Sequence, residues 1–207
     1  KGMSDKNERR AFPDWEKLYK AEPVEKMPWF NPDLDADLAE ALEALDMRGG
    51  LALDIGTGPG TQAFRLREMG FEVTATDLSL TAIKKARKAA REKGLDIDFR
   101  VDDILATRLS GKFDIIFDRG CFHVLPPEER VVYGETVAGL LNEGGYFFLK
   151  CFSVRETKMQ GGPYRLTRKA LKEAFRPAFR AVSIKDTVYQ GTLEALPKAL
   201  FSVWVRK

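Results

Sequence analysis

Apolar runs and amphipathic stretches alternate along the chain after Gly50. Runs rich in β-branched and aromatic residues predict strands at residues 51–54, 71–77, 98–101, 113–118, 146–152, 179–186 and 200–206. Stretches with apolar positions at helical spacing predict helices at residues 61–69, 80–93, 126–141 and 167–175. Because strands and helices alternate, we expect an α/β fold with a mostly parallel sheet and helices on both faces.

The two ends of the chain depart from this alternation. A loop with one weakly helical stretch, residues 193–200, separates the last two strands, so we expect these strands to form an antiparallel hairpin at an edge of the sheet. Residues 1–48 carry several aromatic side chains and a helix-compatible run at 33–45, which predicts a helical cap across the ligand edge of the sheet. Residues 49–207 would then be the α/β core, and the length of 207 residues fits a single domain.

The segment Leu-Ala-Leu-Asp-Ile-Gly-Thr-Gly-Pro-Gly, residues 51–60, joins the first strand to the first helix. Glycines allow a sharp turn and close approach to a ligand, and the helix start offers free N–H groups. The dinucleotide fingerprint G-x-G-x-x-G fails here, because Thr61 occupies its third glycine position. A carboxylate at Asp54 would repel a pyrophosphate and suit an ammonium. The loop therefore favours S-adenosylmethionine over NAD, or is a turn that binds nothing; its candidate cofactor-binding residues are Asp54, Gly56, Thr57, Gly58 and Gly60.

Three further carboxylates follow the ends of later strands, where ligands bind in sheets of this kind. Asp77 lies about twenty residues beyond the loop, the offset expected for a carboxylate that accepts both ribose hydroxyls. Asp103 is expected to accept from the adenine amino group, with the adjacent Asp102 as the alternative. Asp118 ends the fourth strand, beside the place where a methyl group would be transferred. The remaining candidates flank these carboxylates and are Leu78 and Ile104, the latter expected to lie against the adenine ring.

Asp54-Ile-Gly-Thr-Gly-Pro-Gly60, Asp77 and Asp103 together resemble the successive motifs of class I S-adenosylmethionine-dependent methyltransferases. A narrower resemblance, which covers nearly the whole chain, is to the thiopurine methyltransferase-like group with its tellurite-resistance and halide/thiol members. It rests on Trp15-Glu-Lys-Leu-Tyr19, Pro28-Trp29, Phe117-Asp-Arg-Gly-Cys-Phe-His123 and Gly161-Gly-Pro-Tyr164. The resemblance implies a Rossmann-like seven-stranded sheet, an S-adenosylmethionine cofactor and a small, soft methyl acceptor.

The same resemblance places Asp118-Arg119-Gly120 at the acceptor site, because thiopurine methyltransferases have a substrate-facing arginine at the position of Arg119. A guanidinium favours the thiolate, the form in which a thiol reacts, although a structural pairing with Asp118 or with backbone is the alternative. His123, the one histidine, is an auxiliary candidate base or a hydrogen-bonded loop residue. Trp29 would cover the sulfonium or anchor the cap.

Weaker candidates surround this acceptor site. Phe122 and Tyr164 would line the pocket wall. The polar, glycine-containing loop at residues 153–166 would be a lid that excludes water, or an ordinary surface loop.

The composition indicates which classes of binding partner and which cellular compartment to expect. The chain has 34 basic and 31 acidic residues and a net charge of +3, which argues against bulk electrostatic binding to nucleic acid. Cys121 and Cys151 are too few for a disulfide framework or a metal-ligand set, and we expect them to be buried in a reducing compartment. No apolar run is long enough to span a membrane, and residues 1–10 lack a signal-peptide core and should be poorly ordered. We therefore expect a cytoplasmic protein without metal, as a monomer or weak dimer.

The sequence thus predicts an S-adenosylmethionine-dependent methyltransferase that acts on a small molecule, with a thiol, a halide or a reduced chalcogen or metalloid species as acceptor. Its candidate catalytic residues are Arg119, Asp118 and His123, and Asp118 and Trp29 also belong to the candidate cofactor site. O- or N-methylation of a small metabolite is the second hypothesis. A non-catalytic protein that binds S-adenosylmethionine is a third, and methylation of RNA or protein is disfavoured by the low net charge.

Overall fold

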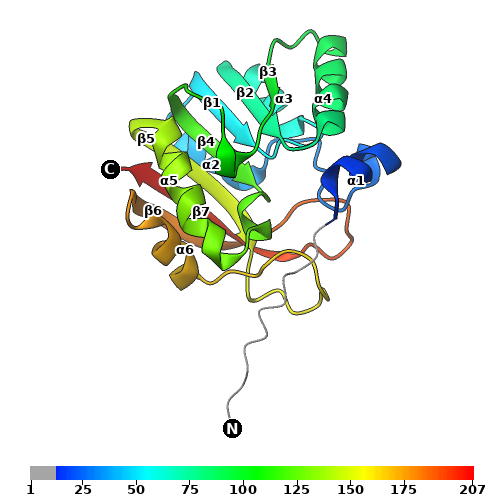
Figure 1. The fold of residues 1–207 in the computed structure, drawn as a ribbon. Helices are drawn as coiled ribbons and strands as arrows, with labels where there is room; N and C mark the ends of the chain where they lie inside the picture. Colours follow the sequence, from blue (N-terminus) through cyan, green and yellow to red (C-terminus); the bar gives the residue numbers. More distant parts are fainter. Residues whose placement is uncertain (1–12) are drawn as a thin grey trace.

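A seven-stranded sheet in the order β3-β2-β1-β4-β5-β7-β6 is the centre of the computed structural model, which describes residues 13–207 (Figure 1). The strands are β1 (Gly50–Ile55), β2 (Phe71–Asp77), β3 (Asp98–Val101), β4 (Phe113–Arg119), β5 (Leu141–Phe152), β6 (Phe179–Val188) and β7 (Lys198–Arg206). Neighbouring strands among β1 to β5 are parallel, and β7 is antiparallel to both β5 and β6. The Rossmann-like, mostly parallel sheet is therefore confirmed. The expected poor order of residues 1–10 lies outside the described residues.

Helices cover both faces of the sheet, as the alternation of strands and helices predicted. One apolar cluster joins the sheet to α2 (Ala36–Ala44), α3 (Thr61–Glu68) and α4 (Leu80–Glu92). A second cluster joins the opposite face to α5 (Arg130–Leu140) and α6 (Arg168–Phe175). The fully buried neighbours Ile115 and Ile116 of β4 enter different clusters, because successive side chains of a strand point to opposite faces.

The start of β5 differs from the prediction. We expected a helix over residues 126–141 and a strand from Tyr146, but a 3₁₀ turn, η4 (Pro127–Glu129), precedes α5, and β5 already begins at Leu141. Gly144 and Gly145, which lie between the predicted helix and the predicted strand, are instead inside β5. There the pairing with β4 shifts register, and Gly144 has a φ of +72°.

The C-terminal strands pair antiparallel, as expected, but β7 lies inside the sheet between β5 and β6, so β6 alone forms this edge. The prediction of a weakly helical stretch at residues 193–200 was wrong, because this segment contains no helix and β7 begins within it at Lys198. The Tyr189 N–H donates to the Pro197 carbonyl over 2.7 Å, so the two strands are still held together at the start of the loop.

The N-terminal part of the chain divides between two places. α1 (Trp15–Ala21) packs on α4 at the side of the molecule and is followed by a 3₁₀ turn, η1 (Val24–Lys26) (Figure 1). The helix-compatible run at 33–45 becomes α2, which belongs to the sheet layer because Leu38 and Leu42 are fully buried there. We call residues 13–35 the cap segment. Two more 3₁₀ turns, η2 (Ile104–Ala106) and η3 (Phe122–Val124), follow β3 and β4.

Candidate active site

The glycine loop joins β1 to α3 at the carboxyl edge of the sheet. Gly56, Gly58 and Gly60 all have positive φ angles, of 66°, 51° and 83°, a region that side chains with a Cβ rarely adopt. The last glycine is also required for packing, since a Cβ on Gly60 would lie 3.0 Å from both Ala86 and Phe64. The loop therefore brings bare backbone to the sheet edge and leads directly into a helix.

Asp54 is buried at the end of β1, beneath the loop. The Thr57 hydroxyl donates to its Oδ2 over 2.6 Å. Burial raises the pKa of Asp54 to about 7, and the nearby carboxylates of Asp118 and Asp77 act in the same direction. A cationic partner would stabilise the ionised form of this buried carboxyl group, so the position suits a ligand ammonium.

Asp77, at the end of β2, holds the loop against the sheet. Its Oδ2 accepts from the Gly58 N–H and its Oδ1 from the Ser79 N–H, each over 2.9 Å. Burial raises the pKa of this carboxyl group. Because each carboxylate oxygen can accept a second hydrogen bond, these contacts are compatible with the predicted role toward ribose.

An apolar side chain and a carboxylate lie exposed just beyond Asp77. Leu78 is 57% exposed. Asp103 is also exposed, and its Oδ1 accepts from the Leu105 N–H over 3.0 Å as the N-cap of η2. Ile104, in contrast, is buried in the core cluster beneath η2. An exposed leucine after β2 and an exposed carboxylate after the neighbouring β3 provide the two features that an adenine ring requires.

Asp102, the alternative to Asp103, turns into its own loop. Its Oδ2 accepts from the Thr107 hydroxyl over 2.5 Å and its Oδ1 from the Arg108 N–H over 2.9 Å. Asp102 is half-buried and holds its own loop, whereas Asp103 is exposed, and contact of Asp103 with adenine stays a prediction.

The cap segment closes over the glycine loop. The Tyr19 hydroxyl lies 2.5 Å from the position that a Cβ on Gly58 would occupy. The Glu16 carboxylate fixes α1 to the start of α4 by accepting from the Ser79 hydroxyl over 2.6 Å and from the Thr81 N–H and hydroxyl over 3.0 and 2.7 Å. These hydrogen bonds, led by that of Ser79, lower the pKa of Glu16 to about 2.

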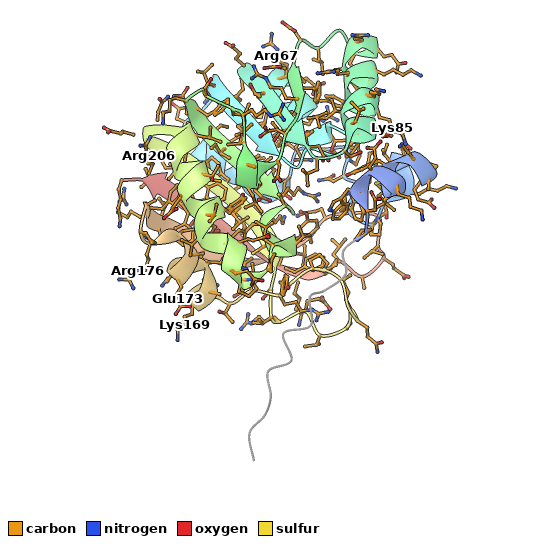
Figure 2. All side chains as sticks on the ribbon, viewed as in Figure 1. Arg67, Lys85, Lys169, Glu173, Arg176 and Arg206 are labelled. Atoms are coloured by element: carbon orange, nitrogen blue, oxygen red, sulfur yellow. The ribbon has the colours of Figure 1, made fainter. Side chains whose placement is uncertain are left out.

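The space between the cap segment and the loop is small. A cavity of about 30 Å³ lies there, bordered by Tyr19, Trp29, Asp54 and Arg119 among others, whereas sites for small molecules usually hold about 300–1,000 Å³. Lys85 of α4 contributes to this closure by donating to the Tyr19 carbonyl, and Figure 2 shows it between α4 and α1. The residues at the sheet edge fit S-adenosylmethionine, which carries an ammonium, a ribose and an adenine. We therefore expect the cap segment to move when the cofactor enters.

Arg119, at the end of β4, connects three distant segments. Its Nε donates to Asp35 over 3.0 Å, its Nη1 to the Trp29 carbonyl over 2.9 Å and its Nη2 to the Gln190 carbonyl. The guanidinium also lies over the Tyr189 ring, 4.5 Å from its centre. Sequence reasoning allowed a structural pairing of Arg119 with Asp118 or backbone; the pairing found is with backbone carbonyls and with Asp35. Arg119 also borders the cavity, so its acceptor role stays a prediction.

Trp29 is both a cavity wall and an anchor for the cap segment. Its indole meets Trp15 edge-on with ring centres 6.0 Å apart, and it packs against the apolar clusters of Tyr19 and of Tyr189. The anchoring role that the sequence allowed is present in the structure. Coverage of the sulfonium stays a prediction.

Asp118 is fully buried and organises the turn after β4. It accepts from the backbone N–H groups of Gly120, Cys121 and Phe122 over 2.7–2.9 Å and from the Tyr133 hydroxyl. Burial raises its pKa to about 6 despite these donors. Four donors on one carboxylate fix the backbone beside Arg119, and a direct role for Asp118 in methyl transfer stays a prediction.

His123 is 4% exposed and accepts from the Phe152 N–H through Nδ1 over 3.1 Å. Its ring stacks on Tyr189 with centres 5.8 Å apart. Burial lowers its pKa to about 3, and the charge of Arg119 adds to this. A buried neutral imidazole with one nitrogen engaged matches the loop-residue alternative, and its action as a base stays a prediction.

The weaker candidates are Phe122, at the start of η3, and Tyr164, in the loop after β5. Phe122 is 1% exposed and packs against Tyr133 and Phe175, so it belongs to the core and its placement on the pocket wall was wrong. The Tyr164 N–H donates to the His123 carbonyl over 2.8 Å and ties residues 153–166 to η3. The lid role of that loop stays a prediction.

Sequence reasoning missed a buried ion cluster behind Arg119. Lys150 of β5 is fully buried and donates to both oxygens of Asp35, to Asp37 over 2.7 Å and to the Gln190 side chain over 2.5 Å. A lysine inside the apolar run of residues 146–152 was the available signal, because a buried lysine requires a carboxylate partner.

Two features are absent from residues 13–207. No group of three or more histidine, cysteine, aspartate or glutamate side chains is placed to hold a metal ion. No helix in this part of the chain combines the length and the apolar character needed to cross a membrane.

Comparisons with known proteins agree with this geometry. Residues 52–145 match a methyltransferase domain family. A ubiquinone biosynthesis O-methyltransferase from Xanthomonas euvesicatoria pv. vesicatoria (strain 85-10) is 32% identical over 171 residues, which are 77% of this chain and 70% of that protein. A probable thiol methyltransferase 2 from Arabidopsis thaliana is 26% identical over 175 residues, 83% of this chain and 76% of the relative.

Solved structures share the fold at lower identity. One has a TM-score of 0.80 at 24% identity, and the match covers 93% of this chain and 90% of that protein. It comes from work on the conversion of a disulfide bond into a thioacetal group during echinomycin biosynthesis. Another is magnesium protoporphyrin IX methyltransferase from Synechocystis PCC 6803, solved with bound S-adenosylmethionine. It has a TM-score of 0.67 at 20% identity, and the match covers 84% of this chain and 77% of that protein. With its glycine loop, its strand-end carboxylates and these relatives, the chain belongs to the S-adenosylmethionine-dependent methyltransferases.

Proposed function

We propose that this methyltransferase acts on a small, soft nucleophile that reacts as an anion, with a thiolate as the representative acceptor. The observation that carries the proposal is the position of Arg119, the one basic residue among those that border the cavity beside the glycine loop. A guanidinium at this place favours an anionic acceptor over its protonated form. The cofactor supplies the methyl group, and the protein holds the acceptor in line with it.

The state of the two candidate bases supports the same acceptor class. Asp118 is occupied by four donors, and His123 is neutral with one ring nitrogen engaged. An alcohol must lose its proton to a base, whereas a thiol, with an ordinary pKa near 8.5, ionises partly by itself. The similarity to a probable thiol methyltransferase points the same way.

For the cofactor we propose a division of contacts along the sheet edge. Asp54 pairs with the ammonium, Asp77 accepts from the ribose hydroxyls and Asp103 accepts from the adenine amino group. Leu78 lies against the adenine ring, and Trp29 covers the sulfonium. The burial of Asp54, the partial burial of Asp77 and the exposure of Leu78 and Asp103 support this arrangement.

Methylation of an oxygen on a small metabolite is the second proposal. It is supported by the ubiquinone biosynthesis O-methyltransferase, the more identical of the two relatives above. In that case Asp118 or His123 would need to change its hydrogen bonds when substrate binds, to release a lone pair for the hydroxyl proton.

Turnover with labelled S-adenosylmethionine separates the two proposals. A panel of thiophenol, sulfide and iodide is compared with catechol and phenol, and methylation of the soft acceptors alone is the expected result. Arg119→Met should lower the rate with thiophenol by about 100-fold, comparable to removal of one positioned charge-stabilising donor. Arg108→Met, at an exposed side chain, is the control.

Because Arg119 also holds the cap segment, the affinity for S-adenosylhomocysteine is measured by calorimetry for the same variants. A rate that falls only in proportion to this affinity would assign Arg119 to the cap and not to the acceptor. Methylation of catechol without any thiol product would overturn the thiolate proposal in favour of the oxygen acceptor.

A further inference from the structure

A second, larger hollow lies at the opposite edge of the sheet from the glycine loop. It has a volume of about 630 Å³ and is formed where α6 ends, β6 begins and β7 ends. Val205 in its lining pairs with Tyr146 on β5, four positions before Lys150, which is about 13 Å along a strand. The hollow is therefore four residues along β5 from Lys150, the strand partner of Arg119. We call it the basic groove.

Five basic residues border the basic groove, and they come from both sides of it: Lys172, Arg176, Arg180, Arg206 and Lys207. Figure 2 shows two of them, Arg176 and Arg206, on the α6 side and the β7 side of this part of the molecule. The lining contains no aspartate or glutamate. Cations from α6, β6 and the end of β7 thus gather around one hollow without an acidic residue among them.

The contacts of these side chains leave their charge uncompensated. Lys207 donates to the Arg176 carbonyl over 2.6 Å, and Arg206 donates to the Leu141 carbonyl, so both are held by neutral backbone groups. Among residues 13–207, none of the five forms an ion pair with a carboxylate. Elsewhere on the surface the pattern is different, since the neighbouring Lys169 of α6 pairs with Glu173 over 3.7 Å. A local excess of positive charge of this kind raises the concentration of anions near it.

The base of the basic groove is apolar. Phe179 and Val205 are buried but border the hollow, and the exposed Ala181 lies beside them. Contact of this apolar surface with hydrocarbon or with an aromatic ring would be favourable, because it removes apolar area from water. The volume falls within the range of about 300–1,000 Å³ that is typical of small-molecule sites. Size, apolar base and cationic border together match one kind of ligand, a small molecule with an apolar body and an anionic head.

We propose that the basic groove binds a small amphipathic organic anion, an aryl or acyl carboxylate, sulfonate or phosphate, at a site separate from methyl transfer. The anionic head pairs with Arg176, Arg180 and Lys172, and the apolar body lies on Phe179 and Val205. The proposal does not depend on which acceptor the enzyme methylates, because no residue of the groove borders the cavity at Arg119.

The test uses 8-anilinonaphthalene-1-sulfonate, an aromatic sulfonate whose fluorescence rises in apolar surroundings. The titration is made with the full chain in saturating S-adenosylhomocysteine, so that the probe does not enter the cofactor site. We expect saturable binding to one site. The double variant Arg176→Glu/Arg180→Glu should bind the probe at least about tenfold more weakly, a change that corresponds to about 1.4 kcal/mol.

A matched variant controls for net charge. Lys84→Glu/Lys93→Glu makes the same charge change on α4, at one exposed helical position and at the C-cap, the position that Arg176 holds on α6. It should bind the probe within about twofold of the wild type, since it lies outside the groove. Octanoate should displace the probe, whereas inorganic phosphate at the same concentration should not, because it lacks the apolar body.

Three results would overturn the proposal. Equal loss of binding in the α4 variant would mean that the probe responds to net charge. Displacement by inorganic phosphate alone would reduce the groove to a general anion patch. Binding to phosphatidylglycerol vesicles through Arg176 and Arg180, without saturable binding of the probe, would make the surface a membrane contact instead.

Discussion

Lys150 and Asp35 are 115 positions apart in the chain, yet they form an ion pair of 2.8 Å in which neither side chain has access to solvent. Asp35 ends the cap segment and Lys150 lies near the carboxyl end of β5, so the pair fastens the cap to the sheet. The same carboxylate accepts from Arg119. Buried ion pairs seldom stabilise a fold more than apolar residues would, because desolvation opposes their attraction. We therefore interpret this one as a positioning device that sets Arg119 when the cap is closed.

Removal of the Lys150 ammonium should lower the stability of the protein. Lys150→Met leaves Asp35 and Asp37 buried with one cation fewer, and we expect the free energy of unfolding to fall by about 3 kcal/mol in urea denaturation. Arg155→Met removes an exposed pair with Asp186 and should leave the free energy of unfolding nearly unchanged. A Lys150→Met protein as stable as the wild type would show that the two carboxylates are neutralised by other groups.

Alanine substitution at Gly58 and at Gly94 should distinguish the effect of a strained backbone from the effect of a steric clash. Gly58 and Gly94 have φ angles of 51° and 66°, but a Cβ on Gly58 would meet the Tyr19 hydroxyl at 2.5 Å, whereas Gly94 has no atom within 4 Å of that position. Both alanine variants should lose about 1 kcal/mol of stability from the strained backbone. Gly58→Ala alone should also displace α1 and weaken the binding of S-adenosylhomocysteine by at least about tenfold, measured by calorimetry. Equal affinities in the two variants would contradict this contact.

The closed cap predicts that its opening limits entry of the cofactor. Glu16→Gln weakens the hydrogen bonds to Ser79 and Thr81 that hold α1 on α4, so association of S-adenosylhomocysteine should become faster while dissociation becomes faster as well. Stopped-flow fluorescence can follow both rates, because Trp15 and Trp29 lie in the cap segment.

Glu25→Gln, at an exposed residue of η1, is the matched control for this experiment and should leave both rates unchanged. If Glu16→Gln and the wild type associate at the same rate, the cap does not gate the site.

Local patterns were sufficient for most of the sheet and for the conformation of the glycine loop. Apolar periodicity placed the strands, and the glycine spacing with Asp54 and Asp77 placed the loop, because each of these features depends on residues near in sequence. The error at the start of β5 came from pairing with another strand. The bulge at Gly144 lies within β5 because β4 supplies pairing partners on both sides of it, which no pattern within residues 141–146 records.

The surroundings of Arg119 could not be predicted in the same way, because its contacts join segments far apart in the chain. Arg119 was identified by resemblance, but its partners Asp35, Trp29 and Gln190 are 71 to 90 positions away. The neutral state of His123 likewise depends on burial beneath segments that meet only in the folded sheet. Residue type and spacing indicate that a group can act as a base, whereas its surroundings decide whether it does.

The raised pKa of Asp54 predicts how cofactor affinity depends on pH. Burial raises this pKa from its ordinary value near 3.8 to about 7, so below pH 7 the carboxyl group of the free protein is mostly protonated. An ammonium binds the ionised form, and ligand binding must then release a proton. The affinity for S-adenosylhomocysteine should therefore rise as the pH increases from 5.5 to 7, by up to about tenfold per unit, and level off above that range. Calorimetry in buffers of different ionisation enthalpy measures both the affinity and the released proton. Asp54→Asn should bind more weakly and lose this pH dependence, and an unchanged profile in the variant would move the titrating group elsewhere, with Asp77 as the next carboxylate to test.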